Sequence, residues 1–436
     1  MAKEKPQALQ GMRDFLPEAM IARQHVIDVA RRVYESCGFE PLDTPCVEYA
    51  DVLMGKYGPE ADKLIYNFED RGGRHVGLRY DLTVPLARVV ACHGDLPRPF
   101  KRYQIGPVWR AERPQKGRYR EFTQCDVDIV GASPPGADAE IVAAFFGVYR
   151  ALGLHDVVIR LNHREILAAM GRAAGIPDEH RTDAFRSIDK LDKMPRETVQ
   201  SEMVELGIDP AAADRLLDTV LSQGPLSSLE TLRDRIAGDE RGLEGLGQME
   251  EISRLLLAMG VPASNFRLDL SLARGLDYYT GMTLEAMLPE MRGSVGGGGR
   301  YDNLVGMFGS LAVPTVGASV GLDRIIDVLA ERGKLPGTRT VTRVLVTVFS
   351  PEMRRESIAL ASSIRQAGIP TETYLLDKPL GKQFQYADQK GVPFAVVIGP
   401  DEMQKGVVTL RDLSQRDQET LTRDELIERI NQRLSS

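Results

Sequence analysis

The residues best suited to chemistry lie in one segment, FKRYQIGPVWRAERPQKGRYREFTQCDVDIVG, from Phe100 to Gly131. Its pattern predicts two strands joined by a polar loop, because apolar and polar residues alternate along the second half. On that second strand Cys125, Val127 and Ile129 face one way. The opposite face combines charged, aromatic and amide side chains, namely Arg120, Phe122, Gln124, Asp126 and Asp128. One face is therefore expected to pack in the core and the other to form a ligand-binding surface.

Basic residues gather on the same hairpin. Between residues 98 and 120 there is a single acid, Glu112, and the loop gains flexibility from Gly117. The basic side chains are Arg98, Lys101, Arg102, Arg110, Arg113, Lys116, Arg118 and Arg120. A solvated charged hairpin is the ordinary meaning of such a run. The amide, the aromatic ring and the two carboxylates on one strand face favour instead a nucleotide bound together with a polar substrate.

Composition narrows the class of protein. The length of 436 residues suggests about three domains. The net charge of −7 means that any contact with nucleic acid depends on local patches. The four cysteines, Cys37, Cys46, Cys92 and Cys125, lack CxxC spacing and are expected to be reduced core thiols. No segment approaches the ~20 apolar residues of a membrane span, so a soluble cytoplasmic enzyme without membrane contact is expected.

The elements that position this hairpin begin with a helix predicted over residues 19–37. Pro41 and Pro45 then interrupt a strand-like run, which favours an edge strand or a strand at an interface. A second hairpin is predicted to turn at residues 71–73, before a helix that begins near Pro85. Asp81 and Thr83 precede that helix, and capping is the simplest role for either side chain.

Helical periodicity dominates residues 165–259, and strand character returns at residues 266–272. The segment between is interpreted as an inserted helical domain. Further on, the glycines at 296–299 match neither a P-loop nor a dinucleotide fingerprint, and they predict backbone lying close to something bulky.

The segment VPTVGASVGLDRIIDVLAERG predicts a strand of small residues followed by an amphipathic helix. Arg324 falls in the first turn of that helix, where the helix dipole disfavours a cation by roughly 0.3–1 kcal/mol. A bound anion or an ion pair with an acid such as Asp323 would each offset this penalty, and both interpretations remain open here.

The last ninety or so residues predict a small α/β domain with no catalytic constellation of its own. GVVTLRDL, residues 406–413, is expected to be an edge strand, and DELIERINQRL, residues 424–434, a final helix.

Four stretches, taken in order, resemble the histidyl-tRNA synthetases, a family of class II aminoacyl-tRNA synthetases. They are the hairpin, RGLDYYTG (274–281), GGGRYDNL (297–304) and VGASVGLDRI (316–325). The resemblance covers essentially the whole chain. The long first helix with the TP-containing strand resembles class II motif 1, residues 110–122 resemble motif 2, and the helix with Arg324 resembles motif 3. These three motifs alone indicate only the broad class, whereas RGLDYYTG and GGRYD indicate histidine.

The resemblance implies an α/β fold with an antiparallel catalytic sheet flanked by helices. The expected divisions are residues 1–164 and 263–333 for the two parts of the catalytic core, 165–262 for a helical insertion and 341–436 for an anticodon-binding domain. The implied partners are L-histidine, ATP with Mg²⁺, tRNA-His and a second copy of the chain in a homodimer. The ligands of the metal are not indicated.

Roles for single residues follow by position. Arg110 and Arg274 would act in catalysis at the α-phosphate, and Arg324 would hold the γ-phosphate. ATP would further contact Glu112, Arg118 and Phe122. Histidine would be bound at its α-amino end by Asp81, Thr83 and Gln124, and at its imidazole end by Asp128, Tyr278, Tyr279 and Tyr301.

Three alternatives compete with a histidine enzyme. The regulatory subunit of ATP phosphoribosyltransferase resembles the same core, but it typically lacks the C-terminal domain and has lost several active-site residues, whereas Arg110, Arg274 and Arg324 are all present here. A tRNA-binding or signalling module would have no evident use for the retained arginines. A synthetase for threonine or proline would share the three motifs but would have little reason to carry RGLDYYTG.

Overall fold

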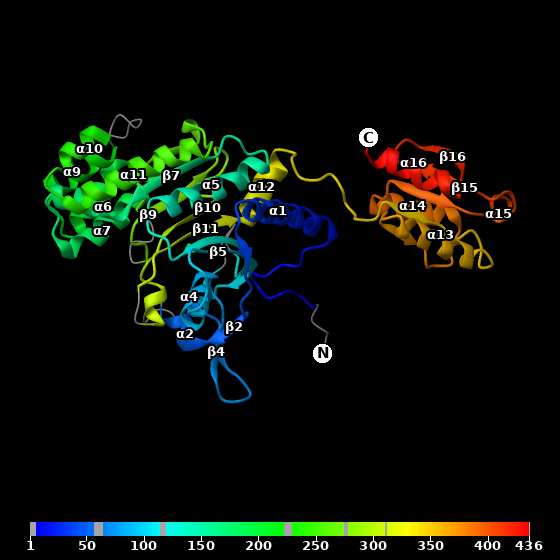
Figure 1. Ribbon diagram of the computed structural model, residues 1–436, viewed down its shortest axis with the longest axis horizontal. Helices are drawn as coiled ribbons and strands as arrows, with labels where there is room; N and C mark the ends of the chain where they lie inside the picture. The colour runs from blue at the N-terminus through cyan, green and yellow to red at the C-terminus, as the bar shows by residue number, and fades with distance from the viewer. Residues whose placement is uncertain are drawn as a thin grey trace. The chain divides into compact units, whose positions relative to one another are not determined.

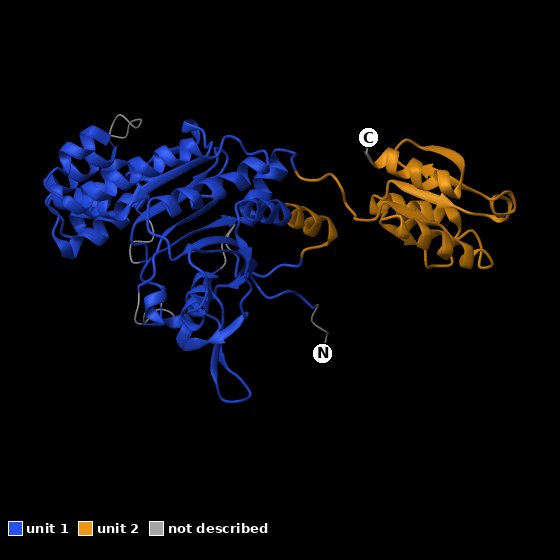
Figure 2. Ribbon diagram, in the orientation of Figure 1, with its two compact units in different colours: residues 1–14, 26–334 blue, residues 15–25, 335–436 orange. Residues whose placement is uncertain are grey.

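The computed structural model describes residues 6–55, 64–113, 119–221, 229–273, 278–309 and 312–435. The chain divides into two compact units, one of residues 1–14 and 26–334 and the other of residues 15–25 and 335–436 (Figure 2). The first long helix, α1 (Pro17–Ser36), is observed where the sequence predicts it.

An eight-stranded sheet forms the centre of the first unit (Figure 1). Its six inner strands are antiparallel to one another, and the strand added at each edge is parallel to the inner strand beside it. In sheet order the strands are β1 (Glu40–Pro41), β5 (Phe100–Trp109), β6 (Glu121–Val130), β11 (Thr315–Gly321), β10 (Gly296–Arg300), β9 (Met282–Met287), β7 (Val158–His163) and β8 (Phe266–Leu268). The antiparallel sheet implied by the resemblance is confirmed, as is the edge position of the strand at Pro41.

The apolar face of the sheet lies against helices. Cys125, Val127 and Ile129 of β6 are at most 1% exposed. Tyr34 of α1 donates its hydroxyl to the carbonyl of Cys125 at 3.3 Å, and α5 (Gly136–Ala151) packs against β11 and β6. Tyr149 of α5 donates to the carbonyl of Val295 at 3.2 Å. The predicted alternation on β6 is therefore confirmed, because these residues form the core beneath the helices.

A small sheet with the order β2-β4-β3 lies between β1 and β5 in the chain. Its strands are β2 (Val47–Tyr49), β3 (Asn67–Glu69) and β4 (His75–Leu78). The predicted turn lies between β3 and β4, where Asp70 accepts hydrogen bonds from the amides of Gly72 and Arg74 at 2.8 and 2.9 Å. Two helices adjoin this sheet, α2 (Ala50–Met54) and α4 (Thr83–Cys92).

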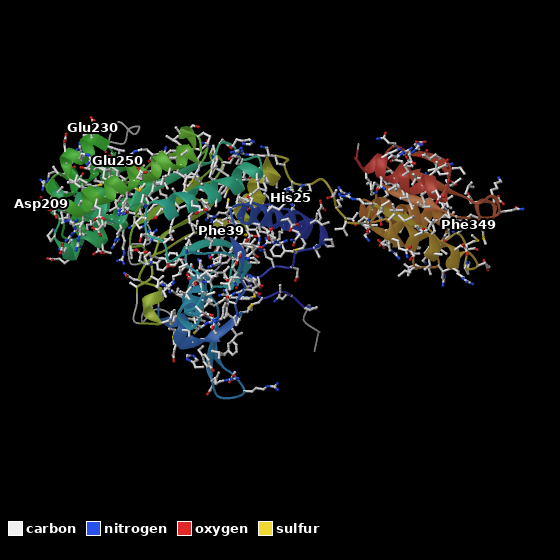
Figure 3. All side chains as sticks on the ribbon, viewed as in Figure 1. His25, Phe39, Asp209, Glu230, Glu250 and Phe349 are labelled. Carbon is white, nitrogen blue, oxygen red and sulfur yellow. The ribbon has the colours of Figure 1, made fainter. Side chains whose placement is uncertain are left out.

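Helices fill the chain from β7 to β8, and the described part of that segment contains no strand. The helices are α6 (Arg164–Ala173), α7 (Asp178–Ile188), α8 (Arg196–Glu205), α9 (Pro210–Leu221), α10 (Leu229–Arg235) and α11 (Glu240–Ala258), with 3-10 turns at Asp189–Asp192 and Ala263–Asn265. Figure 1 shows α6, α7, α9, α10 and α11 gathered beside β7 and β9. Glu230 and Glu250 mark α10 and α11 in Figure 3. A 3-10 turn (Val305–Met307) and α12 (Leu322–Glu331) complete the unit.

The second unit contains a five-stranded sheet of order β13-β12-β14-β15-β16. The strands are β12 (Val344–Val346), β13 (Thr371–Thr373), β14 (Phe394–Val397), β15 (Val407–Asp412) and β16 (Asp417–Thr422). Its helices are α13 (Arg354–Gln366), α14 (Leu380–Lys390), α15 (Pro400–Lys405) and α16 (Arg423–Ser435). Apolar residues of the sheet and helices form a main core that includes Val346, Ile364, Val396 and Ile430, and a smaller cluster of Leu345, Tyr374, Ala387 and Val392. The expected α/β domain is confirmed, and Phe349, labelled in Figure 3, lies just after β12.

Two expectations from the sequence are wrong. β15 is an inner strand, because β16 pairs along its whole length and takes the edge. The cysteines are all free, yet only Cys125 is in the core. Cys37 is half-buried, and Cys46 and Cys92 are exposed. Across the described residues, no helix combines the length and apolar character needed to cross a membrane.

Candidate active site

Two cavities open on the polar face of the large sheet, with volumes of about 380 and 440 Å³. The first cavity contains every predicted histidine-binding residue, namely Asp81, Thr83, Gln124, Asp128, Tyr278, Tyr279 and Tyr301. The second cavity contains four of the predicted ATP-binding residues, Arg110, Glu112, Phe122 and Arg324. Arg110, Gln124, Gly297 and Ser319 line both cavities. The two spaces are therefore contiguous, and they meet beside an arginine.

The pairing of the strands explains why these side chains converge. Residues directly opposite each other on neighbouring strands lie on the same face of a sheet. Asp128 is opposite Arg102 on β5 and Gly317 on β11, and Gly317 is in turn opposite Gly299 on β10. Two residues along β6, a second row on the same face consists of Gln104, Asp126, Ser319, Gly297 and Glu285.

Glycines on β11 and β10 leave space for the side chains that lie over these two strands. A Cβ atom on Gly317 would lie 1.8 Å from Oδ1 of Asp128, and one on Gly299 would lie 2.7 Å from the ring of Tyr279. The side chain of Asp128 therefore packs directly on the backbone of Gly317, and the ring of Tyr279 on the backbone of Gly299. The expectation that the glycine run lies against something bulky is confirmed, because the close backbone approach is possible only without a Cβ.

Asp128 is held from two sides. Nη2 of Arg102 lies 2.8 Å from Oδ2 of Asp128, and both side chains are at most 2% exposed. The Tyr301 hydroxyl donates to Oδ1 of Asp128, and the Tyr301 ring stacks on Tyr278 with centroids 5.2 Å apart. Burial raises the pKa of Tyr301 well above its ordinary value, so its hydroxyl remains a donor. Arg102 belongs to this site, although the sequence marked it only as part of a basic cluster.

Asp81 has both a structural and a cavity-facing position. Its Oδ1 accepts the amide of Val84 at 3.0 Å, so the capping role expected from the sequence is confirmed. The residue also lines the first cavity beside Thr83.

Asp126 lines the candidate site, although the sequence pattern predicted only that it lies on the polar face of β6 and gave it no binding role. It lines the first cavity and is 2% exposed. Burial raises the pKa of Asp126 to about 7, against the opposing charge of Arg102 and with reinforcement from the neighbouring Asp128. Its position two residues from both Gln124 and Asp128 is the signal that could have identified it.

The second cavity is built around Arg110. The guanidinium carbon of Arg110 lies 4.3 Å from the ring centroid of Tyr80 and 4.9 Å from that of Phe122. The Tyr80 hydroxyl donates to Glu112 at 2.7 Å, and burial raises the pKa of Tyr80 to about 12. Two aromatic rings thus contact the guanidinium group, which carries a permanent positive charge at the junction of the two cavities.

Arg324 lies in the first turn of α12, as predicted, and donates through Nη1 to the carbonyl of Ser294. The neighbouring Asp323 forms an ion pair at 2.9 Å with Arg13. This pair gives Asp323 a cation other than Arg324, which lines the second cavity. Two further predicted residues, Arg118 and Arg274, lie outside the described residues.

The antiparallel sheet flanked by helices, with an arginine where two cavities meet on one face of the sheet, is the arrangement of a class II aminoacyl-tRNA synthetase. Residues 11–325 match the family model of histidyl-tRNA synthetase, and residues 343–433 match that of the anticodon binding domain. The chain therefore belongs to the histidyl-tRNA synthetase family.

Individual relatives agree with this assignment. A histidine–tRNA ligase of Rhodopirellula baltica is 43% identical over 418 residues, covering 95% of this chain and 94% of that protein. The crystal structure of histidyl-tRNA synthetase from Nostoc is 34% identical with a TM-score of 0.89, covering 99% of this chain and 100% of that one. A Bacillus halodurans structure, described as an ATP phosphoribosyltransferase regulatory subunit/histidyl-tRNA synthetase, is 24% identical with a TM-score of 0.75, over 88% of this chain and 97% of that chain. It shares the fold.

Proposed function

We propose that this protein is a histidine–tRNA ligase. It activates L-histidine with ATP to form histidyl-adenylate and pyrophosphate, and then transfers histidine to the 3′ end of tRNA-His. Membership of the family supports the activity. The observation that carries the assignment of the site is the meeting of the two cavities at Arg110, Gln124, Gly297 and Ser319.

The first step brings together two anions. The carboxylate of histidine attacks the α-phosphorus of ATP, a bond to the bridging oxygen breaks, and pyrophosphate leaves. Arg110 is proposed to screen this repulsion and stabilise the charge that develops on the α-phosphoryl oxygens. Arg274, whose role rests on the family resemblance, would face the same reacting carboxylate and α-phosphate. Arginine suits this task because its charge does not titrate away.

The remaining ATP contacts follow from the second cavity. Phe122 would stack on the adenine, Glu112 would lie near the base, and Arg118 would reach the phosphates. Arg324 is proposed to receive the γ-phosphate, and the leaving pyrophosphate would depart toward it. A dianionic group at the start of α12 is also favoured by the helix dipole, which supports this orientation of ATP.

Selection of histidine is proposed to depend on hydrogen bonding to the imidazole ring. Asp128, fixed by Arg102 and Tyr301, would accept a ring N–H, and Tyr278 and Tyr279 would enclose the ring. A competitor without ring nitrogens would leave these buried groups unpaired. Sites of this kind discriminate by roughly 10⁴–10⁵ without a second, editing site.

Mg²⁺ is proposed to enter with ATP. The described residues contain no group of three side chains that could hold a metal ion. The carboxylates of the second cavity are Glu112, which accepts from Tyr80, and Asp323, which pairs with Arg13. These residues fit a magnesium ion held mainly by phosphate oxygens, with one or two carboxylates nearby. When bound, the ion would neutralise charge on the departing pyrophosphate.

The wider assembly is also part of the proposal. The second unit would bind the anticodon of the tRNA, supported by its match to that domain. A homodimer would cover apolar side chains of the small sheet, since Val47, Tyr49 and Phe68 are 43%, 56% and 47% exposed. The four free cysteines favour a reducing compartment such as the cytoplasm.

The test is ATP–pyrophosphate exchange with the purified full chain and each amino acid in turn. We expect exchange that depends on histidine alone and falls roughly 10²–10³-fold in Arg274→Ala. Arg254→Ala is the matched control, because Arg254 is 68% exposed on α11 and pairs only with nearby Glu251 among the contacts described. A folded protein that binds histidine but supports no exchange would refute the ligase and favour the regulatory relative.

A further inference from the structure

Asp126 and Gln124 present buried hydrogen-bond acceptors that the described part of the protein leaves unused. Within it, Oδ1 of Asp126 and Oε1 of Gln124 are buried and have no hydrogen-bond partner. The two residues are alternate positions of β6, so they point to the same face, and both line the first cavity. A buried acceptor without a partner destabilises the folded protein, so two of them on one cavity wall call for an explanation, and a ligand that donates hydrogen bonds supplies one.

The charges around Asp126 are predominantly negative. Arg102 of β5 is the cation that acts most strongly on it, and that guanidinium is already paired with Asp128 at 2.8 Å. The Ser319 hydroxyl also donates to the Asp126 carboxylate, and Arg110 lines the same cavity as a second cation against the four carboxylates of Asp81, Asp126, Asp128 and Glu285. Asp128 on the same strand and Asp81 before α4 both add to the negative potential at Asp126. Tyr279 faces the same group with its hydroxyl protonated, because burial raises its pKa. The first cavity therefore has an excess of negative charge beside Asp126.

An ammonium group fits this combination. It carries one positive charge and three N–H donors, and it would lie among Asp81, Gln124 and Asp126. Asp81 alone cannot satisfy it, since Oδ1 of Asp81 already accepts the amide of Val84. The imidazole ring fits less well here, because it is largely neutral near pH 7 and Asp128 with its tyrosines already forms a separate polar site one row away.

We infer that Asp126 is a specificity-determining residue that binds the α-ammonium group of histidine, together with Gln124 and beside Asp81. This assignment rests on the proposed function, because it presumes that histidine occupies the first cavity. It makes Asp126 a discriminator between amino acids and the corresponding acids that lack an amine.

The proposed contact links histidine binding to the protonation of Asp126. Because burial holds the pKa of Asp126 near 7, much of the free protein carries this carboxyl protonated at neutral pH. An arriving ammonium favours the carboxylate, so the proton leaves the protein when the ligand binds. Histidine binding should therefore release up to about one proton near pH 7, and the affinity should fall as the pH is lowered through that value.

The experiment is calorimetric titration of the full chain and of Asp126→Asn with three probes. L-Histidine and L-histidinol both carry the ammonium, whereas 3-(imidazol-4-yl)propanoate lacks it. We expect Asp126→Asn to weaken the first two by roughly 10- to 100-fold, the range of one charge-assisted hydrogen bond, and to leave the propanoate within about twofold. Titrations in buffers of different ionisation enthalpy should show that the proton release is lost.

Asp95→Asn is the matched control, since it makes the same change at an exposed position before β5. Equal weakening of all three probes in Asp126→Asn would overturn the assignment, because the residue would then act on the ring or on the fold. Unchanged binding of histidine and histidinol would overturn it as well. If the unaltered protein neither binds histidine nor supports histidine-dependent pyrophosphate exchange, the proposed function fails and this assignment fails with it.

Discussion

Gly317 on β11 is predicted to be essential to the first cavity because no other residue fits there. In Gly317→Ala the new Cβ would lie 1.8 Å from Oδ1 of Asp128, 2.5 Å from its Cγ and 2.9 Å from the carbonyl of Val127. Ordinary contacts need about 3.5 Å. The Asp128 carboxylate must therefore move by more than about 1 Å, or β11 must separate from β6.

The cost follows from what holds Asp128. Moving the carboxylate breaks the buried pair with Arg102 at 2.8 Å and the hydrogen bond from Tyr301. Disrupting a buried ion pair costs about 3–5 kcal/mol when one charge is left without its partner. We expect Gly317→Ala to lower the free energy of unfolding by about 3 kcal/mol or more. Histidine binding should weaken at least roughly 10-fold, because Asp128, the acceptor proposed for the imidazole ring, would be displaced.

Urea unfolding of the free protein gives the first quantity, and histidine titration of the folded variant gives the second. Gly247→Ala is the matched control. Gly247 lies within α11, and a Cβ added there would have no atom within 4 Å, so this change should stabilise the protein by about 0.5–1 kcal/mol. If Gly317→Ala unfolds at the same urea concentration as the unaltered protein and binds histidine equally well, then the reasoning about Asp128 is wrong.

Three further outcomes are expected. Tyr301→Phe removes the hydroxyl that donates to Asp128, so KM for histidine in pyrophosphate exchange should rise roughly 10-fold with kcat little changed; a fall in kcat alone would contradict this. Asp126 has a pKa raised from 3.8 to about 7, so the folded state binds its proton more tightly and loses stability as the pH rises through that interval. Urea unfolding without ligand should therefore show Asp126→Asn gaining stability over the unaltered protein between about pH 5 and about pH 8, and no change in the difference would count against the buried carboxyl. Arg332→Ala removes contacts with Asp156 at 2.7 Å and Glu290 at 2.6 Å near the surface, and should cost less than about 1 kcal/mol, decreasing with added salt; a salt-independent loss would exclude an electrostatic origin.

Much of the fold follows from local pattern. Alternation along residues 121–130 and helical periodicity after Pro17 arise from the geometry of single strands and helices, so both can be predicted from a short window of sequence. Arg324 could be assigned to the first turn of α12 for the same reason. The order of the four motifs then indicated the family, which the comparisons confirm.

Pairing between distant segments could not be predicted in the same way. The edge position expected for β15 was wrong because nothing within that strand reveals that β16 follows and pairs with it. The exposure of Cys46 and Cys92 likewise depends on which segments pack over them, whereas their local apolar setting suggested burial.

The sequence by itself determined which side chains share a strand face, where the main helices lie and which family the motifs indicate. Only the tertiary structure decided that Arg102 forms an ion pair with Asp128 and that Asp126 is buried beside other carboxylates. It also decided that Asp128 and Tyr279 pack against Gly317 and Gly299, where a Cβ atom would overlap them. The physical reason is that β6 pairs with β11, and β11 with β10, only across a long stretch of intervening chain, while Arg102 meets Asp128 through the pairing register of β5 and β6. Ion pairing, burial and pKa depend on these contacts and not on neighbours along the chain.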